Sequence, residues 1–210
     1  YLEVDEGIAG WMLFKTNQGT DAHFQAFYER QQPATNWIRS HVVFCHKGKI
    51  SMTPRTIRGS HVICAVDSPA GQLKVICYRE SGSLRRVVAS LTKGDEVIVC
   101  GGTRKREAEI SLNLEKLVIL NLVDISVKRR PICPKCGIRC DSKGLRQGYA
   151  CRRCGFRIAD PVIEKKVRKI STGTYLPDPS GQRHLTKPLS RYDLEAPRST
   201  SEALVSDWLR

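Results

Sequence analysis

Two Cys-x-x-Cys pairs constrain this chain of 210 residues more than any other feature of its sequence. Cys133 and Cys136 form the first pair, and Cys151 and Cys154 form the second after a spacer of fourteen residues. Each pair can present two thiolates from one tight turn, and two such turns supply the four tetrahedral ligands that Zn²⁺ prefers. A disulfide framework is the rival interpretation, but paired knuckles suit metal better. We therefore predict a structural zinc ribbon whose closed shell leaves no position open for catalysis.

The small and aromatic residues of this segment fit a ribbon. Gly137 and Gly155 each follow the second cysteine of a pair, where a positive φ eases the turn. Cys140 does not fit the pair spacing, so we leave it out of the ligand set. Tyr149 and Phe156 suit stacking on unpaired bases or the core of the ribbon, and we favour the core for Phe156.

Positive charge is concentrated on the same segment. The chain has a net charge of +14, and residues 128–169 hold 14 basic and 3 acidic side chains. Such a basic patch favours a polyanion, meaning RNA, DNA or an anionic membrane, and among these we favour nucleic acid. The alternative is a solvated charged surface. Candidate RNA-binding residues near the knuckles are Lys135, Arg139, Lys143, Arg146, Arg152, Arg153 and Arg157.

Residues 41–127 show the patterns of a small β domain. Strands are predicted at 60–66, 72–78, 95–102 and 108–120 from short apolar runs and alternation. A helix is predicted at 83–91, where apolar residues recur at helical spacing. This order of strands, helix and strands suits an OB-fold, although periodicity alone leaves other small β folds open.

Four further cysteines lie in or near these strands. They are Cys45, Cys64, Cys77 and Cys100. None has a partner at knuckle spacing, so we expect buried small hydrophobic side chains rather than metal ligands.

The stretches TNQGTDAHF (16–24), YRESGSLRRVV (78–88), SLNLEKL (111–117) and GTYLPDPSGQRHLTKPLSRY (173–192), together with the ribbon, carry a family resemblance. In order, from about residue 11 to residue 192, the chain resembles the C-terminal half of the archaeal tRNA-isoleucine 2-agmatinylcytidine synthetases. NQGTDAH, LNLEKL, RRC and RHLTKPL are its most specific parts. An OB-fold followed by a zinc ribbon would not be specific without them.

The resemblance implies an activity. Members of this family use ATP to join agmatine to C2 of the wobble cytidine of isoleucine tRNA, so that AUA is translated as isoleucine. The implied cofactors are structural Zn²⁺, with ATP and Mg²⁺ in the whole enzyme. The implied partners are agmatine and the anticodon loop of the tRNA, in the cytoplasm and without a membrane. The ATP-consuming domain is not in this sequence, so we expect this segment to be inactive alone.

The resemblance also implies a domain plan of mainly β class with some α. We expect the C-terminal part of a ferredoxin-like domain at 1–40, an OB-fold at 41–127 and a zinc ribbon at 128–169. A C-terminal tail is expected at 170–210, and the amphipathic pattern of 202–209 predicts a short helix there. Because the chain starts without Met, we expect an upstream part to precede it.

Two polar motifs carry the remaining candidate residues. Asn17, Gln18, Asp21 and His23 are candidates for substrate binding, because a carboxylate suits the cationic groups of agmatine and a histidine can carry a proton. From spacing alone, an ordinary polar turn is favoured instead. Arg183, His184 and Lys187 are candidates for RNA binding. Their segment is expected to be an ordered tail packed on another domain or on RNA, with a flexible terminus as the alternative.

Two segments depart from the family pattern. Residues 78–85 read YRESGSLR where relatives commonly have YEPTKxFR, and Asp178 and Gln182 are departures in the later motif. We therefore do not assign to these two segments the tRNA contacts that their counterparts make in the family. A second class of function stays open, a non-catalytic OB-fold and zinc-ribbon protein that binds RNA or DNA.

Overall fold

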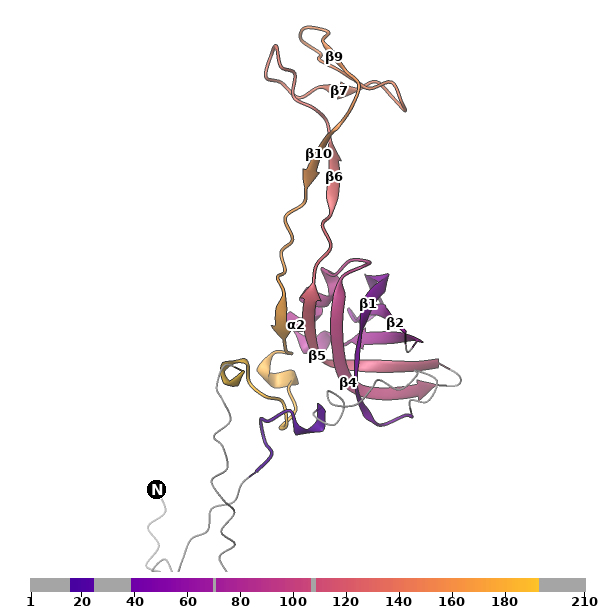
Figure 1. The fold of residues 1–210 in the computed structure, drawn as a ribbon, viewed down its shortest axis with the longest axis vertical. Helices are drawn as coiled ribbons and strands as arrows, with labels where there is room; N and C mark the ends of the chain where they lie inside the picture. Colours follow the sequence, from indigo (N-terminus) through magenta and orange to yellow (C-terminus); the bar gives the residue numbers. More distant parts are fainter. Residues whose placement is uncertain (1–15, 25–38, 70, 107–108, 193–210) are drawn as a thin grey trace, which may run out of the picture.

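A closed β-barrel carries a small cysteine-containing ribbon at the end of a two-stranded stalk (Figure 1). The computed structural model describes residues 16–24, 39–69, 71–106 and 109–192. Most of the expected ferredoxin-like part at 1–40, and the helix expected at 202–209, lie outside these residues.

Five strands close the barrel. They are β1 (Val43–Thr56), β2 (Val62–Ser68), β3 (Gly71–Cys77), β4 (Glu96–Arg106) and β5 (Glu109–Asn121). The order around the barrel is β1-β2-β3-β5-β4, and β4 pairs back with β1. Neighbouring strands are antiparallel except β3 and β5, which are parallel. Closure removes the exposed edges that an open sheet would have.

The predicted OB-fold is confirmed. A 3₁₀ turn, η2 (Arg79–Ser81), and the helix α2 (Ser83–Ala89) lie between β3 and β4. Leu84 and Val88 of α2 are buried in the barrel core, as their helical spacing predicts. The four predicted strands correspond to β2, β3, β4 and β5.

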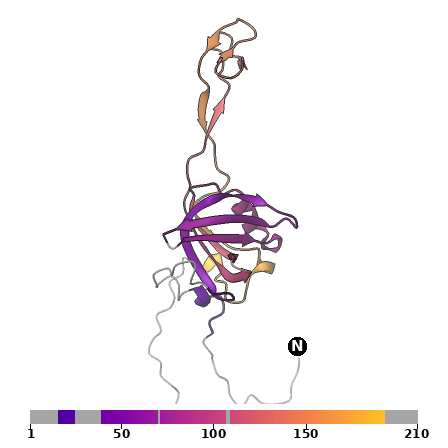
Figure 2. The same ribbon diagram turned by 90° about the vertical axis from the view of Figure 1, so that its right-hand side faces the viewer.

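The stalk consists of β6 (Ser126–Arg129) and β10 (Val162–Lys165), which pair antiparallel. All residues of both strands are exposed. Figures 1 and 2 show that the stalk projects away from the barrel in both views. Beyond it lie the three short strands of the ribbon, which pair in the order β7-β8-β9. They are β7 (Asp141–Ser142), β8 (Tyr149–Ala150) and β9 (Arg157–Ile158).

A buried ion pair fixes the base of the stalk to the barrel. Arg168 follows β10 and donates to both carboxylate oxygens of Asp95, at 3.1 Å from Nη1 and 2.7 Å from Nη2. The Asp95 side chain is fully buried, and it also accepts the backbone N–H groups of Thr92 and Val123. Arg168 donates further to the carbonyl oxygens of Val123 and Ser90. The two strands that lead to the ribbon are therefore anchored at one point.

The segment after the stalk returns to the barrel. Strand β11 (Gly173–Tyr175) pairs with the C-terminal half of β5, and the next residue, Leu176, is buried. Two 3₁₀ turns follow, η3 (Pro179–Gly181) and η4 (Leu189–Arg191). Residues 173–192 are thus ordered against the barrel, which agrees with an ordered tail packed on another domain.

The two segments that depart from the family pattern contact each other. Asp178 Oδ1 accepts hydrogen bonds from the backbone N–H and the hydroxyl of Ser83, the first residue of α2. The residue before Ser83 is Gly82, which has no side chain to cap the helix. Asp178 therefore caps α2 from a distant part of the chain.

All four scattered cysteines are buried and lie outside the metal cluster, as expected, but a disulfide between two of them was not predicted. Cys64 and Cys77 are buried, unbonded thiols in the barrel core. Cys45 and Cys100 are also buried, but they lie opposite each other on β1 and β4 and are joined by a disulfide. The partner was missed because spacing along the sequence carries no information about pairing across a sheet.

Within the described part of the chain, no helix combines the length and the apolar character that a membrane crossing requires.

Candidate metal centre and nucleic-acid interface

The two cysteine knuckles have the same backbone geometry. The N–H of Gly137 donates to the carbonyl of Cys133 at 2.8 Å, and the N–H of Gly155 donates to the carbonyl of Cys151 at 2.9 Å. Both glycines have positive φ, 67° and 70°, as predicted. The two pairs thus form matching tight turns, which is the local structure that presents two sulfur ligands from one turn.

The four predicted ligands converge. The Sγ atoms of Cys133, Cys136, Cys151 and Cys154 all lie within 4.8 Å of one another. Cys133 Sγ and Cys154 Sγ are 3.6 Å apart. A tetrahedron with Zn–S bonds of about 2.3 Å has edges of about 3.8 Å, so the arrangement matches zinc. Four thiols and no open corner fit a structural metal.

Two of the four thiols have shifted pKa values. Hydrogen bonding from the Cys154 backbone N–H lowers the pKa of Cys151 to about 7. The neighbouring Cys154 thiol raises the pKa of Cys136 to about 12. The Cys136 thiol thus resists loss of its proton beside Cys154, and a bound Zn²⁺ would supply the positive charge that favours the thiolate.

Cys140 belongs to the core of the ribbon and not to the ligand cluster. It is fully buried against Cys133 and Cys151. Phe156 is half-buried in the same cluster, with Lys135 Nζ 5.2 Å from its ring centre. The core role favoured for Phe156 agrees with this placement, and Cys140 acts as a small apolar side chain.

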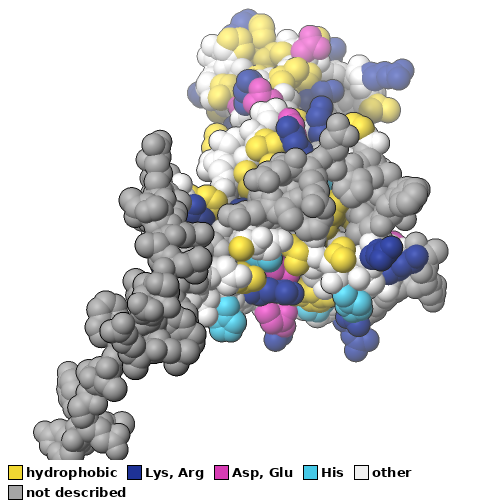
Figure 3. Space-filling model, turned by 60° about the horizontal axis from the view of Figure 1, so that its bottom comes forward, with side chains coloured by type: hydrophobic (Ala, Val, Ile, Leu, Met, Phe, Trp, Pro, Cys, Tyr) yellow, Lys and Arg dark blue, Asp and Glu magenta, His cyan; other side chains and the backbone are white. Residues whose placement is uncertain are grey.

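The basic residues of the ribbon surround this core. All seven candidates are exposed: Lys135, Arg139, Lys143, Arg146, Arg152, Arg153 and Arg157. Within the described residues, none of them forms an ion pair with a carboxylate. Figure 3 shows Lys and Arg side chains on the ribbon at the top and on the barrel face below it. The ribbon thus presents uncompensated positive charge on a rigid support.

A second site forms where NQGTDAH, LNLEKL and the segment that begins with RHLTKPL meet. We call it the motif junction, and it comprises Gly19, Asp21, His23, Glu115, Lys116, Arg183, Lys187 and Tyr192. The backbone N–H of Gly19 donates to the carbonyl of His184 at 3.0 Å, and that of Asp21 donates to Leu185 at 2.8 Å. Segments more than 150 residues apart in the sequence therefore lie side by side on β5.

Asp21 is the centre of the junction. Its side chain is buried and forms an ion pair of 2.8 Å with Lys116. It also accepts the hydroxyl of Tyr192 at 2.7 Å and the backbone N–H of Lys187 at 2.8 Å. Burial alone would raise the pKa of Asp21, but these hydrogen bonds outweigh it and lower the pKa. Burial raises the pKa of Tyr192 to about 12.

A second carboxylate lies beside this network. Glu115 Oε1 accepts the backbone N–H of Gly102 at 3.1 Å and pairs with Arg183 Nη2 at 2.9 Å. Burial raises the pKa of Glu115, while Arg183 and Gly102 oppose the shift. Its other oxygen is 3.8 Å from His23 Nε2, and burial lowers the pKa of His23.

The predicted residues of the polar motifs are thus in different environments. Asn17, Gln18 and His184 are exposed, His23 is partly buried, and Asp21 is inside the ion pair. Sequence reasoning missed the partners Glu115, Lys116 and Tyr192, although LNLEKL was singled out as specific. A lysine in an alternating strand, at a position where apolar residues face the core, was the available signal.

Fold and site together define a class: an OB-fold barrel with a zinc ribbon and an exposed basic surface, the features of a nucleic-acid-binding module. Residues 130–170 match the model of the TiaS C-terminal zinc ribbon domain. Over most of its length the chain is similar to the C-terminal portion of the tRNA-isoleucine 2-agmatinylcytidine synthetase TiaS.

Two relatives illustrate the extent of the similarity. The TiaS of Thermofilum pendens is 39% identical over 95% of this chain and 44% of its own length. The TiaS of Archaeoglobus fulgidus is 34% identical over 88% of this chain and 42% of its own length. The chain therefore spans less than half of the curated relatives that it matches.

Solved structures agree in fold. The crystal structure of a complex of TiaS with its isoleucine tRNA and ATP superposes with a TM-score of 0.66 and 33% identity, over 85% of this chain and 40% of that one. A complex of TiaS with the same tRNA, AMPCPP and agmatine gives a TM-score of 0.62 and 31% identity, over 85% and 39%. Both likenesses extend well beyond the ribbon.

Proposed function

We propose that this chain is the tRNA-binding part of an ATP-dependent ligase that attaches agmatine to C2 of the wobble cytidine of isoleucine tRNA. The observation that carries the proposal is the likeness to TiaS along 85–95% of the chain. It includes the barrel and the ribbon, and the structural likeness covers 85% of the chain at 33% identity.

The division of labour follows from the residues. The ribbon and its basic side chains hold the phosphate backbone near the anticodon loop, and zinc keeps their spacing fixed. Contacts of this kind position the RNA and take no part in the covalent reaction. ATP, Mg²⁺ and the chemical step belong to a domain outside this chain, and the whole enzyme acts in the cytoplasm.

In this proposal, the motif junction lies next to the site where agmatine binds. Asn17 and Gln18 are exposed and can donate or accept hydrogen bonds. Burial lowers the pKa of His23, so its imidazole is neutral, and because both ring nitrogens are buried it supports this turn beside Glu115. Asp21 is already bonded to Lys116 and Tyr192, so it acts by positioning this turn.

The test is incorporation of radiolabelled agmatine into an isoleucine tRNA transcript by the whole gene product, with ATP and Mg²⁺. Label is expected in the transcript with the wobble cytidine and not in a matched transcript with uridine there. If the protein binds the transcript tightly but transfers no label, the non-catalytic nucleic-acid-binding function replaces this proposal.

A further inference from the structure

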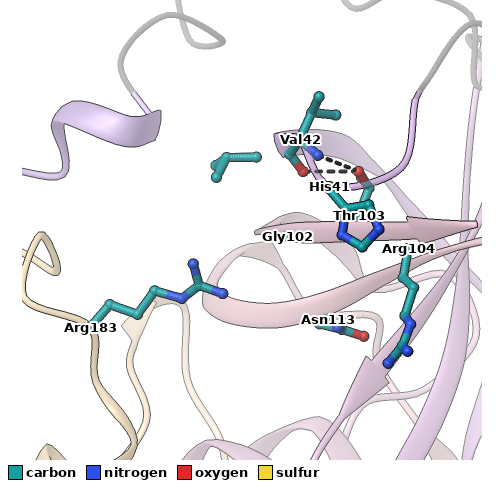
Figure 4. Close-up of a pocket in the computed structure, with 8 residues that line it drawn as sticks. His41, Val42, Gly102, Thr103, Arg104, Asn113 and Arg183 are labelled. Carbon is teal, nitrogen blue, oxygen red and sulfur yellow. Dashed lines mark hydrogen bonds between the residues drawn. The ribbon is translucent and has the colours of Figure 1, made fainter.

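A cavity of about 270 Å³ lies between the barrel and the C-terminal segment. Four of its polar side chains come from four places in the chain: His41 before β1, Arg104 on β4, Asn113 on β5 and Arg183 after η3. Figure 4 shows Arg183 and Arg104 on opposite sides of His41 and Asn113. Neither Asp nor Glu is among the described residues that line it.

One guanidinium of the cavity is oriented in advance. Arg183 is 62% exposed, but its Nη2 is held at 2.9 Å by the largely buried Glu115. Glu115 is itself held by the backbone N–H of Gly102 on the floor of the cavity. Since Gly102 has no side chain, nothing at this position covers the inner edge of Arg183. An anion that binds the remaining N–H groups therefore meets a side chain that is already ordered.

The rim opposite Arg183 is rigid as well. His41 has a φ of 63°, a conformation that non-glycine residues adopt only when their surroundings enforce it. Its N–H donates to the carbonyl of Thr103, and the Thr103 hydroxyl bonds to Val42 and to the carbonyl of Arg39. The backbone that carries the imidazole is therefore held at the cavity mouth.

Arg104 supplies uncompensated charge. It is exposed, and the described part of the chain offers it no ion-pair partner. Asn113 accepts the hydroxyl of Tyr78 at its amide oxygen, which leaves the amide nitrogen as a donor. The arginine and asparagine side chains that line the cavity can thus donate hydrogen bonds, and two of them are planar guanidinium groups that match phosphate geometry.

We propose that this cavity binds a single backbone phosphate of the tRNA, through Arg104, Arg183 and Asn113. The inference rests on the proposed function, because it takes tRNA as the ligand. No Phe, Tyr or Trp is among the described residues that line the cavity, so it lacks a platform for stacking a base. Its volume is also smaller than about 300 Å³, the lower end for enclosed small-molecule sites.

The test is phosphate-ethylation interference with end-labelled isoleucine tRNA and the full chain of residues 1–210. Ethylation of the bound phosphate should exclude that tRNA from the complex with wild-type protein and with Arg104→Lys. With Arg104→Gln the exclusion at that one phosphate should disappear, and affinity should fall roughly tenfold, as expected for a lost charge-assisted hydrogen bond. Arg104 is exposed, so neither variant disturbs the core.

Arg55→Gln is the matched control. Arg55 is exposed near the opposite end of β1, so its loss should leave the interference at the proposed phosphate intact. An interference pattern that is identical for wild type and Arg104→Gln overturns the phosphate site while tRNA binding stands. Absence of tRNA binding by the wild-type chain instead overturns the proposed function itself.

Discussion

The barrel and the ribbon differ in what holds them together. The barrel encloses a cluster of seventeen buried apolar residues inside a closed sheet. The described ribbon has three strands of two residues each and a buried cluster of Cys133, Cys140 and Cys151. Burial of apolar area supports the first, at about 1.5–3 kcal/mol for each large side chain. The second has too little apolar area to fold without a metal.

The two regions should therefore respond to different substitutions. In the barrel, the sensitive points are polar groups that the apolar core has buried, and each must keep its partner. In the ribbon, the sensitive point is the metal, and the exposed basic side chains can be changed without loss of fold. The stalk transmits little between the two, because its residues are exposed and only its base is anchored.

The largest expected effect is the loss of zinc from the ribbon. Cys154→Ser should release the metal and unfold residues 130–170 while the barrel keeps its thermal transition, because structural zinc supplies about 10–16 kcal/mol of apparent binding free energy. Elemental metal analysis and amide exchange measure the two outcomes. Cys140→Ala is the matched control and should retain the zinc. Full zinc content in Cys154→Ser would contradict the ligand assignment.

The next effect concerns the buried ion pair of the junction. Lys116→Met should lower the free energy of unfolding by about 3–5 kcal/mol, because it leaves the Asp21 carboxylate buried without its cation. The double variant with Asp21→Asn should recover part of this loss, since the neutral amide still accepts the Lys187 N–H. Denaturant unfolding measures both. A double variant less stable than Lys116→Met alone would argue against a partnership between the two residues.

A smaller effect is expected at the base of the stalk. Arg168→Ala should lower the free energy of local unfolding at the base of the stalk by about 3 kcal/mol, because the fully buried Asp95 loses its bidentate partner. The amide of Val123, which donates to Asp95, should then exchange faster. Lys165→Ala is the control, because its ion pair with Asp124 is about three-quarters exposed on both sides and adds little to stability. If Arg168→Ala and Lys165→Ala change the exchange rate of the Val123 amide equally, the ion pair between Arg168 and Asp95 does not anchor the stalk.

The smallest effect concerns the contact between the two unusual segments. Ser83→Ala and Asp178→Ala should each destabilise α2 slightly, and together they should cost less than the sum, because both remove the same cap. Thermal unfolding of the four proteins of the cycle measures the coupling. Strict additivity would show that the two departures from the family pattern are independent.

Local patterns predicted the parts of this fold that local rules control. Alternation located the strands β2 to β5, helical spacing located α2, and glycine after each cysteine pair predicted the positive φ values at Gly137 and Gly155. The convergence of the four thiols followed from metal chemistry alone. In each case the signal lies within a few residues along the chain.

The missed features all join distant parts of the chain. The disulfide between Cys45 and Cys100, the ion pair between Asp21 and Lys116 and the cap at Ser83 span from 55 to 95 residues. Strand register decides the disulfide, and one sequence does not reveal register between strands that are not joined by a short turn. The other two contacts depend on where loops and tail segments dock on the folded barrel. The motifs were recognised one by one, but their meeting point was visible only in three dimensions.

The central claim is that this chain binds tRNA through the positively charged side chains of a ribbon whose fold is stabilised by zinc. The most direct measurement is the affinity for isoleucine tRNA across a range of salt concentrations, for wild type and for Arg152→Gln with Arg153→Gln. Affinity should fall steeply with salt, with a logarithmic slope of about −0.7 to −0.9 for each phosphate neutralised, and should fall less steeply in the variant. An affinity that is nearly independent of salt, or a slope unchanged in the variant, would contradict it.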